Sequence, residues 1–171
     1  MEAFLETGRL SLRNLKQADT DEIYAWRNDP RCRQYQRWED TSREAVDAFV
    51  SRFGADVFLS DQEEQHYAIC AGEQIVGDLS YFYTEEDACI TLGITIAPWF
   101  QRKGYARELL HAVVNAIQSR HPRLDIVALI DKENRASIAL FESLGFYREC
   151  YAESIASYVY VIEGKEKKNV L

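Results

Sequence analysis

The chain has 171 residues, of which 47% are hydrophobic and 12% aromatic, and its formal net charge is -8 at pH 7. This length suits one well-packed core and excludes two typical domains, so we expect a single domain over residues 1–171. The acidic charge disfavours nucleic acid and anionic membranes as partners, because both carry charge of the same sign, and it favours cationic partners instead.

The four cysteines are far apart in the sequence and form no C-x-x-C pair. They are Cys32, Cys70, Cys89 and Cys150. We expect buried free thiols in a reducing compartment, and no metal site, since the three histidines also lack ligand spacing. No basic leader and no apolar run of membrane-spanning length is present, which predicts a cytoplasmic protein.

The N-terminal third predicts a strand and two helices. Residues 9–15 alternate polar and apolar side chains, which is the period of a half-buried strand. Residues 19–28 carry apolar side chains at helical spacing and stop before Pro30. A second helix is expected to begin near Ser42, which can cap it. Between the helices, residues 31–40 are charged and aromatic; such segments often line acceptor sites, but we expect a solvated loop.

The middle of the chain predicts three strands that form an antiparallel meander. The strand-like runs are residues 66–71, 74–84 and 88–97, separated by turn residues. The third run is mostly apolar, which indicates a central strand covered on both faces. After Pro98 and a turn, apolar residues recur at steps of three and four along a long helix.

The C-terminal third predicts one more strand at residues 124–130, a helix at residues 135–144 closed by Gly145, and two strands at residues 146–151 and 158–163. The fold class is therefore α+β: a mixed, mostly antiparallel central sheet of about seven strands flanked by four helices.

The segment with the clearest chemistry is the turn that precedes the long helix. The first N–H groups of a helix are unpaired and lie at the positive end of its dipole, so they can bind phosphate. A glycine lets the backbone approach the anion, and neighbouring basic residues add positive charge. The turn consists of Gln101, Arg102, Lys103, Gly104, Tyr105 and Ala106.

With this turn the chain resembles the GNAT superfamily of N-acetyltransferases, whose hallmark is [QR]-x-x-G-x-[GA] between a strand and a long helix. The likeness continues downstream in Asn134-Arg135-Ala136-Ser137 and in Leu144-Gly145-Phe146. Upstream, T-G-R-L-S-L-R-N-L and a helix ending in R-N-D-P look like the RimJ/RimL-like branch.

The resemblance implies that the fourth and fifth strands, residues 88–97 and 124–130, splay apart, and that the pantetheine arm of acetyl-CoA lies between them. Residues 101–106 would wrap the pyrophosphate, and Asn134 would bind the arm near the thioester. The remaining expected contacts with the cosubstrate are Ile94, Thr95, Ile96, Ser137 and Phe141.

The sequence departs from the superfamily pattern at two catalytic positions. Phe141 stands where many members carry a tyrosine acid, and Thr91 stands where many carry a glutamate base. We expect Ser137 to interact with the leaving sulfur, because the RimJ/RimL-like branch has a serine there; the alternative is a helix-capping serine. Asp78 and the turn of residues 85–87 are weak candidates for the base.

The sequence thus predicts an acetyl-CoA-dependent N-acetyltransferase that acts on a cationic primary amine, such as a protein or peptide N-terminus. The alternatives are a polyamine or aminoglycoside N-acetyltransferase, a non-catalytic acyl-CoA-binding module, or an interaction protein in which the turn is merely a turn. The sequence leaves open a homodimer, the acceptor and the use of other acyl groups.

Overall fold

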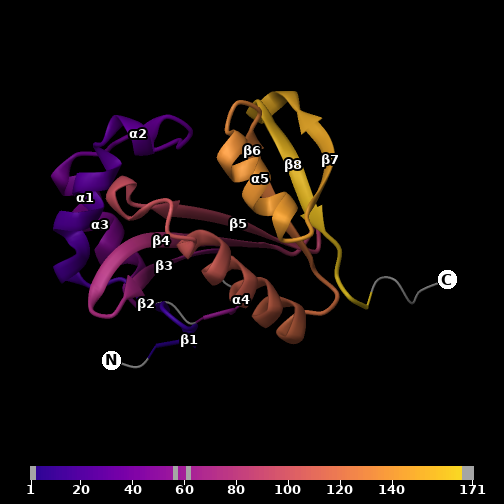
Figure 1. Cartoon of the computed structure of the whole chain (residues 1–171), viewed down its shortest axis with the longest axis horizontal. Helices are drawn as coiled ribbons and strands as arrows, with labels where there is room; N and C mark the ends of the chain where they lie inside the picture. The colour runs from indigo at the N-terminus through magenta and orange to yellow at the C-terminus, as the bar shows by residue number, and fades with distance from the viewer. Residues whose placement is uncertain (1–2, 56–57, 61–62, 167–171) are drawn as a thin grey trace.

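A computed structural model describes residues 3–55, 58–60 and 63–166. In this part of the chain eight strands form one sheet with the order β1-β2-β3-β4-β5-β6-β8-β7 (Figure 1). All neighbours are antiparallel except β5 and β6, which are parallel. The strands are β1 (Leu5–Glu6), β2 (Ser11–Asn14), β3 (Glu64–Ala71), β4 (Gln74–Thr84), β5 (Cys89–Ile96), β6 (Asp125–Asp131), β7 (Tyr147–Ala152) and β8 (Ser157–Ile162).

Five α-helices accompany the sheet in the described residues. They are α1 (Thr20–Arg27), α2 (Pro30–Arg33), α3 (Arg43–Phe53), α4 (Tyr105–Arg120) and α5 (Arg135–Ser143). The α+β class and the order of the predicted elements are confirmed. The predicted boundaries agree to within a few residues, and Ser42 caps α3 by accepting a hydrogen bond from the Ala45 N–H.

Among the strands and α-helices, two were not predicted, the two-residue strand β1 and the four-residue helix α2. Residues 31–40 were expected to be irregular, which is wrong for residues 31–33. Pro30 lies at the start of α2, where its missing N–H costs nothing, and the Asp29 carboxylate accepts a hydrogen bond from the Arg31 N–H. Pro30 therefore ends one helix and begins another.

Helices cover both faces of the sheet. Successive side chains on a strand point to opposite faces, so one strand contributes to two hydrophobic clusters. On β3, Tyr67 and Ile69 belong to one hydrophobic cluster, together with the apolar stripe of α4. Ala68 and Cys70 belong to a second cluster, which contains buried residues of α1 and α3. Figure 1 shows α1 and α3 at one end of the sheet and α4 across its front.

The parallel pair β5 and β6 separates after three residue pairs. Cys89, Ile90 and Thr91 lie opposite residues 125–127, and no pairing continues beyond them. β6 instead pairs with β8 along residues 126–131, while β5 stays paired with β4 up to Ile96. This opens a splay between β5 and β6. β5 is central, as predicted, but residues 93 and 94 are only half-buried because they line the splay.

The cysteines are all free, but they are not all buried as expected. Cys32 and Cys70 are buried, Cys89 is half-buried, and Cys150 is exposed on the edge strand β7. Burial raises the pKa of the Cys32 thiol to about 12, so this thiol stays protonated at neutral pH. None of the described helices is long and apolar enough to cross a membrane.

Candidate functional site

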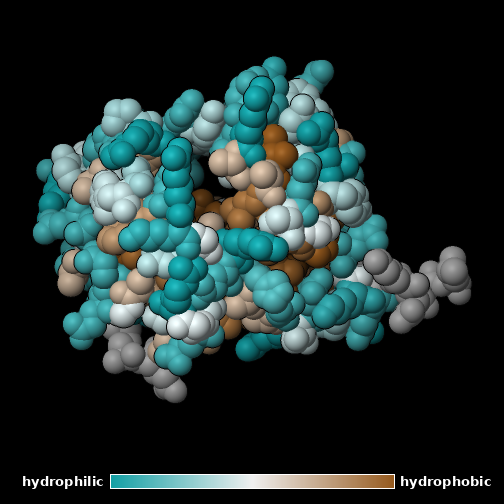
Figure 2. Space-filling view, in the orientation of Figure 1, coloured by the Kyte–Doolittle hydropathy of each residue, from teal (hydrophilic) through white to brown (hydrophobic). Residues whose placement is uncertain are grey.

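Two cavities occupy the splay between β5 and β6. The larger, the cleft, has a volume of about 550 Å³ and runs from the splay to the N-terminus of α4. The smaller, the chamber, has a volume of about 140 Å³ and reaches across β5 toward β4 and β3. Figure 2 shows the hollow between the two halves of the molecule, with hydrophobic residues at its floor.

Ten of the twelve residues expected to contact the cosubstrate line the cleft. Phe141 lines the chamber instead, where its ring packs edge-on against Phe146. Lys103 is exposed and does not line the cleft; its ammonium lies 5.6 Å from the centroid of the Phe100 ring. The residues that line the cleft as expected are Ile94, Thr95, Ile96, Gln101, Arg102, Gly104, Tyr105, Ala106, Asn134 and Ser137.

The turn of residues 101–106 presents the N-terminus of α4 to the cleft. Gly104 is the N-cap, with φ +79°, and no side chain caps the helix there. Arg102 also has a left-handed backbone, with φ +63°. Two left-handed residues bend the chain sharply enough to aim the first N–H groups of α4 outward. This geometry can bind a phosphate oxygen.

Arg9 stabilises the turn of residues 101–106 by a hydrogen bond, and it was not predicted from the sequence. Its Nη1 donates to the Lys103 carbonyl at 2.9 Å, and its Nε donates to Glu108 Oε2 at 2.7 Å. The hydrogen bonds from Thr7 and Arg9 lower the pKa of the Glu108 carboxyl, with Thr7 contributing most. No local signal marks this contact, because almost a hundred residues separate Arg9 from the turn.

The backbone of β5 offers open polar groups to the cleft. The Ala97 N–H donates to the Val76 carbonyl at 2.8 Å, on the β4 side of the sheet. Backbone groups alternate sides along a strand, so Ile96 and Ile94 face the open edge while Thr95 faces β4. The Ile96 carbonyl already accepts a hydrogen bond from Gln101 Nε2 at 2.9 Å. Ile94 is thus left with its N–H and carbonyl on the open edge.

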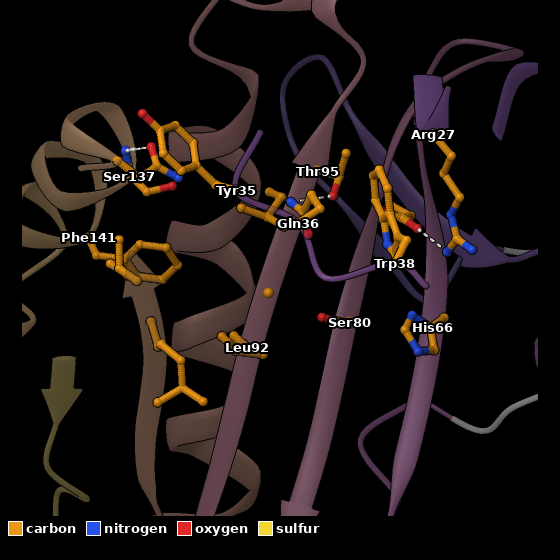
Figure 3. Close-up of a pocket in the computed structure, with 17 residues that line it drawn as sticks. Arg27, Tyr35, Gln36, Trp38, His66, Ser80, Leu92, Thr95, Ser137 and Phe141 are labelled. Carbon is orange, nitrogen blue, oxygen red and sulfur yellow. Dashed lines mark hydrogen bonds and ion pairs between the residues drawn. The ribbon is translucent and has the colours of Figure 1, made fainter. Parts of the chain in front are cut away.

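At the start of α5 the structure separates the two roles considered for Ser137. The helix is capped by Asn134, whose Oδ1 accepts a hydrogen bond from the Ser137 N–H at 3.2 Å (Figure 3). Within residues 3–55, 58–60 and 63–166, Ser137 Oγ has no hydrogen-bond partner. Ser137 lines both cavities. Its hydroxyl is therefore free for a ligand at the junction.

A segment that we call the strap, residues 34–38, crosses the splay and separates the two cavities. Tyr35 and Gln36 line both of them. The Tyr35 hydroxyl donates to the Glu133 carbonyl at 3.1 Å, and Gln36 Nε2 donates to Thr95 Oγ1 at 3.2 Å. Arg37 donates to the Ser157 hydroxyl at 3.0 Å. The strap is a loop with exposed residues, as expected, but these hydrogen bonds also fix it over the splay, where it lines both cavities.

Charged groups lie in the chamber on the side opposite Ser137 (Figure 3). Asp78 on β4 is buried, and its Oδ2 lies 3.9 Å from Arg27 Nη2. Burial raises the pKa of the Asp78 carboxyl, against the opposing effects of Arg27, His66 and a hydrogen bond with Thr95. Sequence reasoning rated Asp78 weakly and missed Arg27 and His66, because only the register of β3, β4 and β5 brings them together.

The other candidates for a base lie elsewhere. Residues 85–87 form the β4–β5 turn, next to Cys89 at the paired end of β5, and they line neither cavity. Thr91 also lies in the paired part of β5. Among the described residues there is no group of three or more histidine, cysteine, aspartate or glutamate side chains that could hold a metal ion.

Comparison with known proteins identifies a family and a fold. A family model described as an acetyltransferase (GNAT) domain matches residues 9–147. The chain matches no curated protein sequence. A GNAT-family acetyltransferase from Bacillus anthracis is a structural neighbour, with a TM-score of 0.77, 18% identity, and coverage of 94% of this chain and 98% of that one.

Two further neighbours were solved with ligands. One is RimL, the ribosomal L7/L12 alpha-N-protein acetyltransferase, in complex with coenzyme A; its TM-score is 0.78 at 20% identity, covering 96% of this chain and 99% of that one. The other is the microcin C7 self-immunity acetyltransferase MccE with acetyl-CoA and AMP, at a TM-score of 0.76 and 15% identity, covering 91% and 93%. At these identities the neighbours share the fold.

Proposed function

Since the chain belongs to the GNAT acetyltransferase domain family, we propose that it transfers the acetyl group of acetyl-CoA to a primary amine, the N-terminal amine of a protein or peptide. The likeness to RimL, an alpha-N-protein acetyltransferase, supports this acceptor. The observation that carries the proposal is the free Ser137 hydroxyl, which lies where the cleft and the chamber meet.

The residues of the cleft suit acetyl-CoA. The N-terminus of α4, where Gly104 is the N-cap and no side chain caps the helix, would bind the pyrophosphate. The open backbone groups of Ile94 on β5 would pair with an amide of the pantetheine arm, as a neighbouring strand would. Asn134 Oδ1 is used by the helix cap, but its Nδ2 remains available to donate to the arm.

Acetyl-CoA supplies an activated acyl thioester, so the protein needs mainly to position the amine and to stabilise charge. Ser137 would donate a hydrogen bond from its hydroxyl to the sulfur as negative charge develops there, and coenzyme A would leave as the thiolate. Asp78 would accept the proton that the amine loses, since it lies in the chamber across β5 from Ser137. Burial keeps the pKa of Asp78 above its ordinary value, which improves it as a base.

An α-amino acceptor agrees with this chemistry. The ordinary pKa of an α-amino group is about 7.7–8.0, against about 10.4 for a lysine side chain, so far more of it is deprotonated at neutral pH. A single buried carboxylate is a modest base, and it therefore favours the less basic amine. A polyamine or an aminoglycoside remains the alternative acceptor, because the net charge of -8 attracts cations to the surface.

The experiment measures thiol release from acetyl-CoA and the mass of the acceptor together. The acceptors are a peptide with a free N-terminus, its N-blocked counterpart that contains lysine, spermidine and an aminoglycoside. We expect the free N-terminus to give the highest kcat/KM. Preference for the blocked lysine peptide would refute this acceptor. Binding of coenzyme A by calorimetry without any turnover would instead identify a non-catalytic acyl-CoA-binding module.

A further inference from the structure

Arg27, the last residue of α1, is a buried cation whose donors are unfilled. It is 7% exposed, lines the chamber, and packs over the Phe49 ring, with Cζ 4.0 Å from its centroid. In the part of the chain that the structure describes, its guanidinium makes no hydrogen bond, and its Nε is buried without a partner. The Asp78 carboxylate, 3.9 Å from Nη2, lies beyond hydrogen-bonding distance. A buried donor without an acceptor destabilises the fold, so a ligand that supplies an acceptor gains from filling it.

Arg13 shows how the same fold completes a buried arginine that has a structural role. It is 8% exposed, and two of its nitrogens donate to the Asp19 carboxylate at 2.7 and 2.8 Å. A further bond of 2.8 Å reaches the Asn14 carbonyl. Arg13 lines neither cavity. Arg27 differs from it in facing a chamber and in lacking oxygen acceptors, so the chamber is suited to a ligand that brings an oxygen.

We infer that Arg27 binds an oxygen atom adjacent to the acceptor amine, so that the acceptor is an α-amino carbonyl compound. This rests on the proposed acetyl transfer and names the residue that would distinguish such an acceptor from other primary amines. Arg27 would donate to the carbonyl or carboxylate oxygen, and Asp78 would lie beside the amine. Both a peptide N-terminus and a free amino acid present this pair of groups on neighbouring carbons.

The same geometry disfavours a polyamine. A diamine brings a second cation and no oxygen, so it would leave the Arg27 donors unfilled and would be repelled by the guanidinium. The small volume of the chamber, about 140 Å³, also admits only a compact group next to the amine. His66, which also lines the chamber, is hydrogen-bonded to Glu64 Oε1 at 2.9 Å. An imidazole carries no negative charge that could bind the second ammonium group of a diamine.

The test compares a free-N-terminal peptide with an isostere in which an alkene replaces the first peptide bond, which removes the oxygen and keeps the shape. The readout is the ratio of the two kcat/KM values in wild type, Arg27→Lys and Arg13→Lys. Differences in amine pKa between the two acceptors cancel when this ratio is compared between enzymes. Lysine keeps the charge near Asp78 but loses the planar fork of donors.

We expect wild type to prefer the carbonyl peptide, and Arg27→Lys to reduce this preference by roughly tenfold to a hundredfold, the scale of a hydrogen bond to a charged donor. Arg13→Lys should lower the melting temperature and leave the preference unchanged. A free amino acid serves as a third acceptor, and its acetylation in place of the peptide would support the inference and identify the source of the α-amino carbonyl group.

An unchanged preference in Arg27→Lys would overturn the inference while leaving acetyl transfer in place, and so would activity confined to spermidine. Failure to acetylate any amine would refute the proposed function, and the inference with it. If Arg27→Lys does not fold, the Nε–Hε NMR resonance of Arg27 in wild type is followed on addition of acetylated product peptide with coenzyme A. A downfield proton shift is expected, and no change would overturn the inference.

Discussion

Replacing Ser137 with alanine distinguishes catalysis from helix capping, because the structure assigns the cap to Asn134. The variant keeps the Asn134 Oδ1 bond to the backbone N–H of residue 137. It removes only a hydroxyl that has no partner among the described residues. Alanine is also the better helix former. The free energy of unfolding should therefore change by less than about 0.5 kcal/mol.

The expected loss appears in turnover. A single donor to a developing charge contributes roughly tenfold to a thousandfold in kcat, or about 1.4–4 kcal/mol. The hydrogen bond from Ser137 to sulfur strengthens as charge develops, so it stabilises the transition state more than bound acetyl-CoA. The KM for acetyl-CoA should accordingly change little while kcat falls.

The assay is steady-state thiol release with a free-N-terminal peptide, together with thermal unfolding of each protein. Ser143→Ala is the matched control, since Ser143 also lies on α5, its Oγ donates to the Leu140 carbonyl at 2.6 Å, and it lines neither cavity. Unchanged kcat in Ser137→Ala would refute the reasoning. Equal losses of kcat in both variants would assign the effect to the helix rather than to the hydroxyl.

Gly104→Val should weaken coenzyme A binding at least tenfold by calorimetry. The control is Gly72→Val, at another left-handed glycine with no neighbour within 4 Å. Both variants should lower the melting temperature by roughly 2–8 °C, but only Gly104→Val should weaken binding. Arg9→Ala should weaken coenzyme A binding about threefold to thirtyfold by releasing the turn, and unchanged affinity would show that the turn holds itself. Asp78→Asn should lower kcat/KM by roughly a hundredfold or more, and equal activity would exclude Asp78 as the base. Burial raises the pKa of Asp78 above the ordinary 3.8, so the folded protein binds this proton more tightly than the unfolded chain. The free energy of unfolding of wild type, relative to Asp78→Asn, should therefore fall as pH rises from about 3.8 through the raised pKa. Urea unfolding at several pH values measures this difference between the two proteins, and a difference that does not change with pH would contradict the prediction.

The sequence predicts the elements of this fold well because their signals are local. The apolar stripe of α4, the capping serine at Ser42 and the turn around Gly104 each occupy a few consecutive residues. Ten of the twelve residues expected to contact acetyl-CoA line the cleft for the same reason, since one turn and one helix start supply much of its wall. The local pattern did not predict α2, because Pro30 marks the end of the preceding helix as well as the start of α2.

The charged residues of the chamber were largely missed because they meet only through long-range pairing and packing. Asp78 lies on β4, opposite Ala68 on β3 and Thr95 on β5. Arg27 lies near Asp78 although it belongs to a helix some fifty residues earlier in the chain. Each of these residues looks ordinary in its own segment. A buried ion pair has no sequence period, so no local rule could have selected it.

In the proposed reaction, the splay would let the two substrates meet on one strand. β5 pairs with β4 along its whole length, but with β6 at only three positions, so its second edge is open from Leu92 onward. Backbone groups on such an edge need partners, and the Ile96 carbonyl has already taken one from Gln101. In the proposed reaction, Asp78 on the neighbouring strand β4, opposite Thr95, would act as the base. The cosubstrate would complete the edge of β5, the acceptor would fill the chamber beyond it, and the Ser137 hydroxyl lies where the two cavities join.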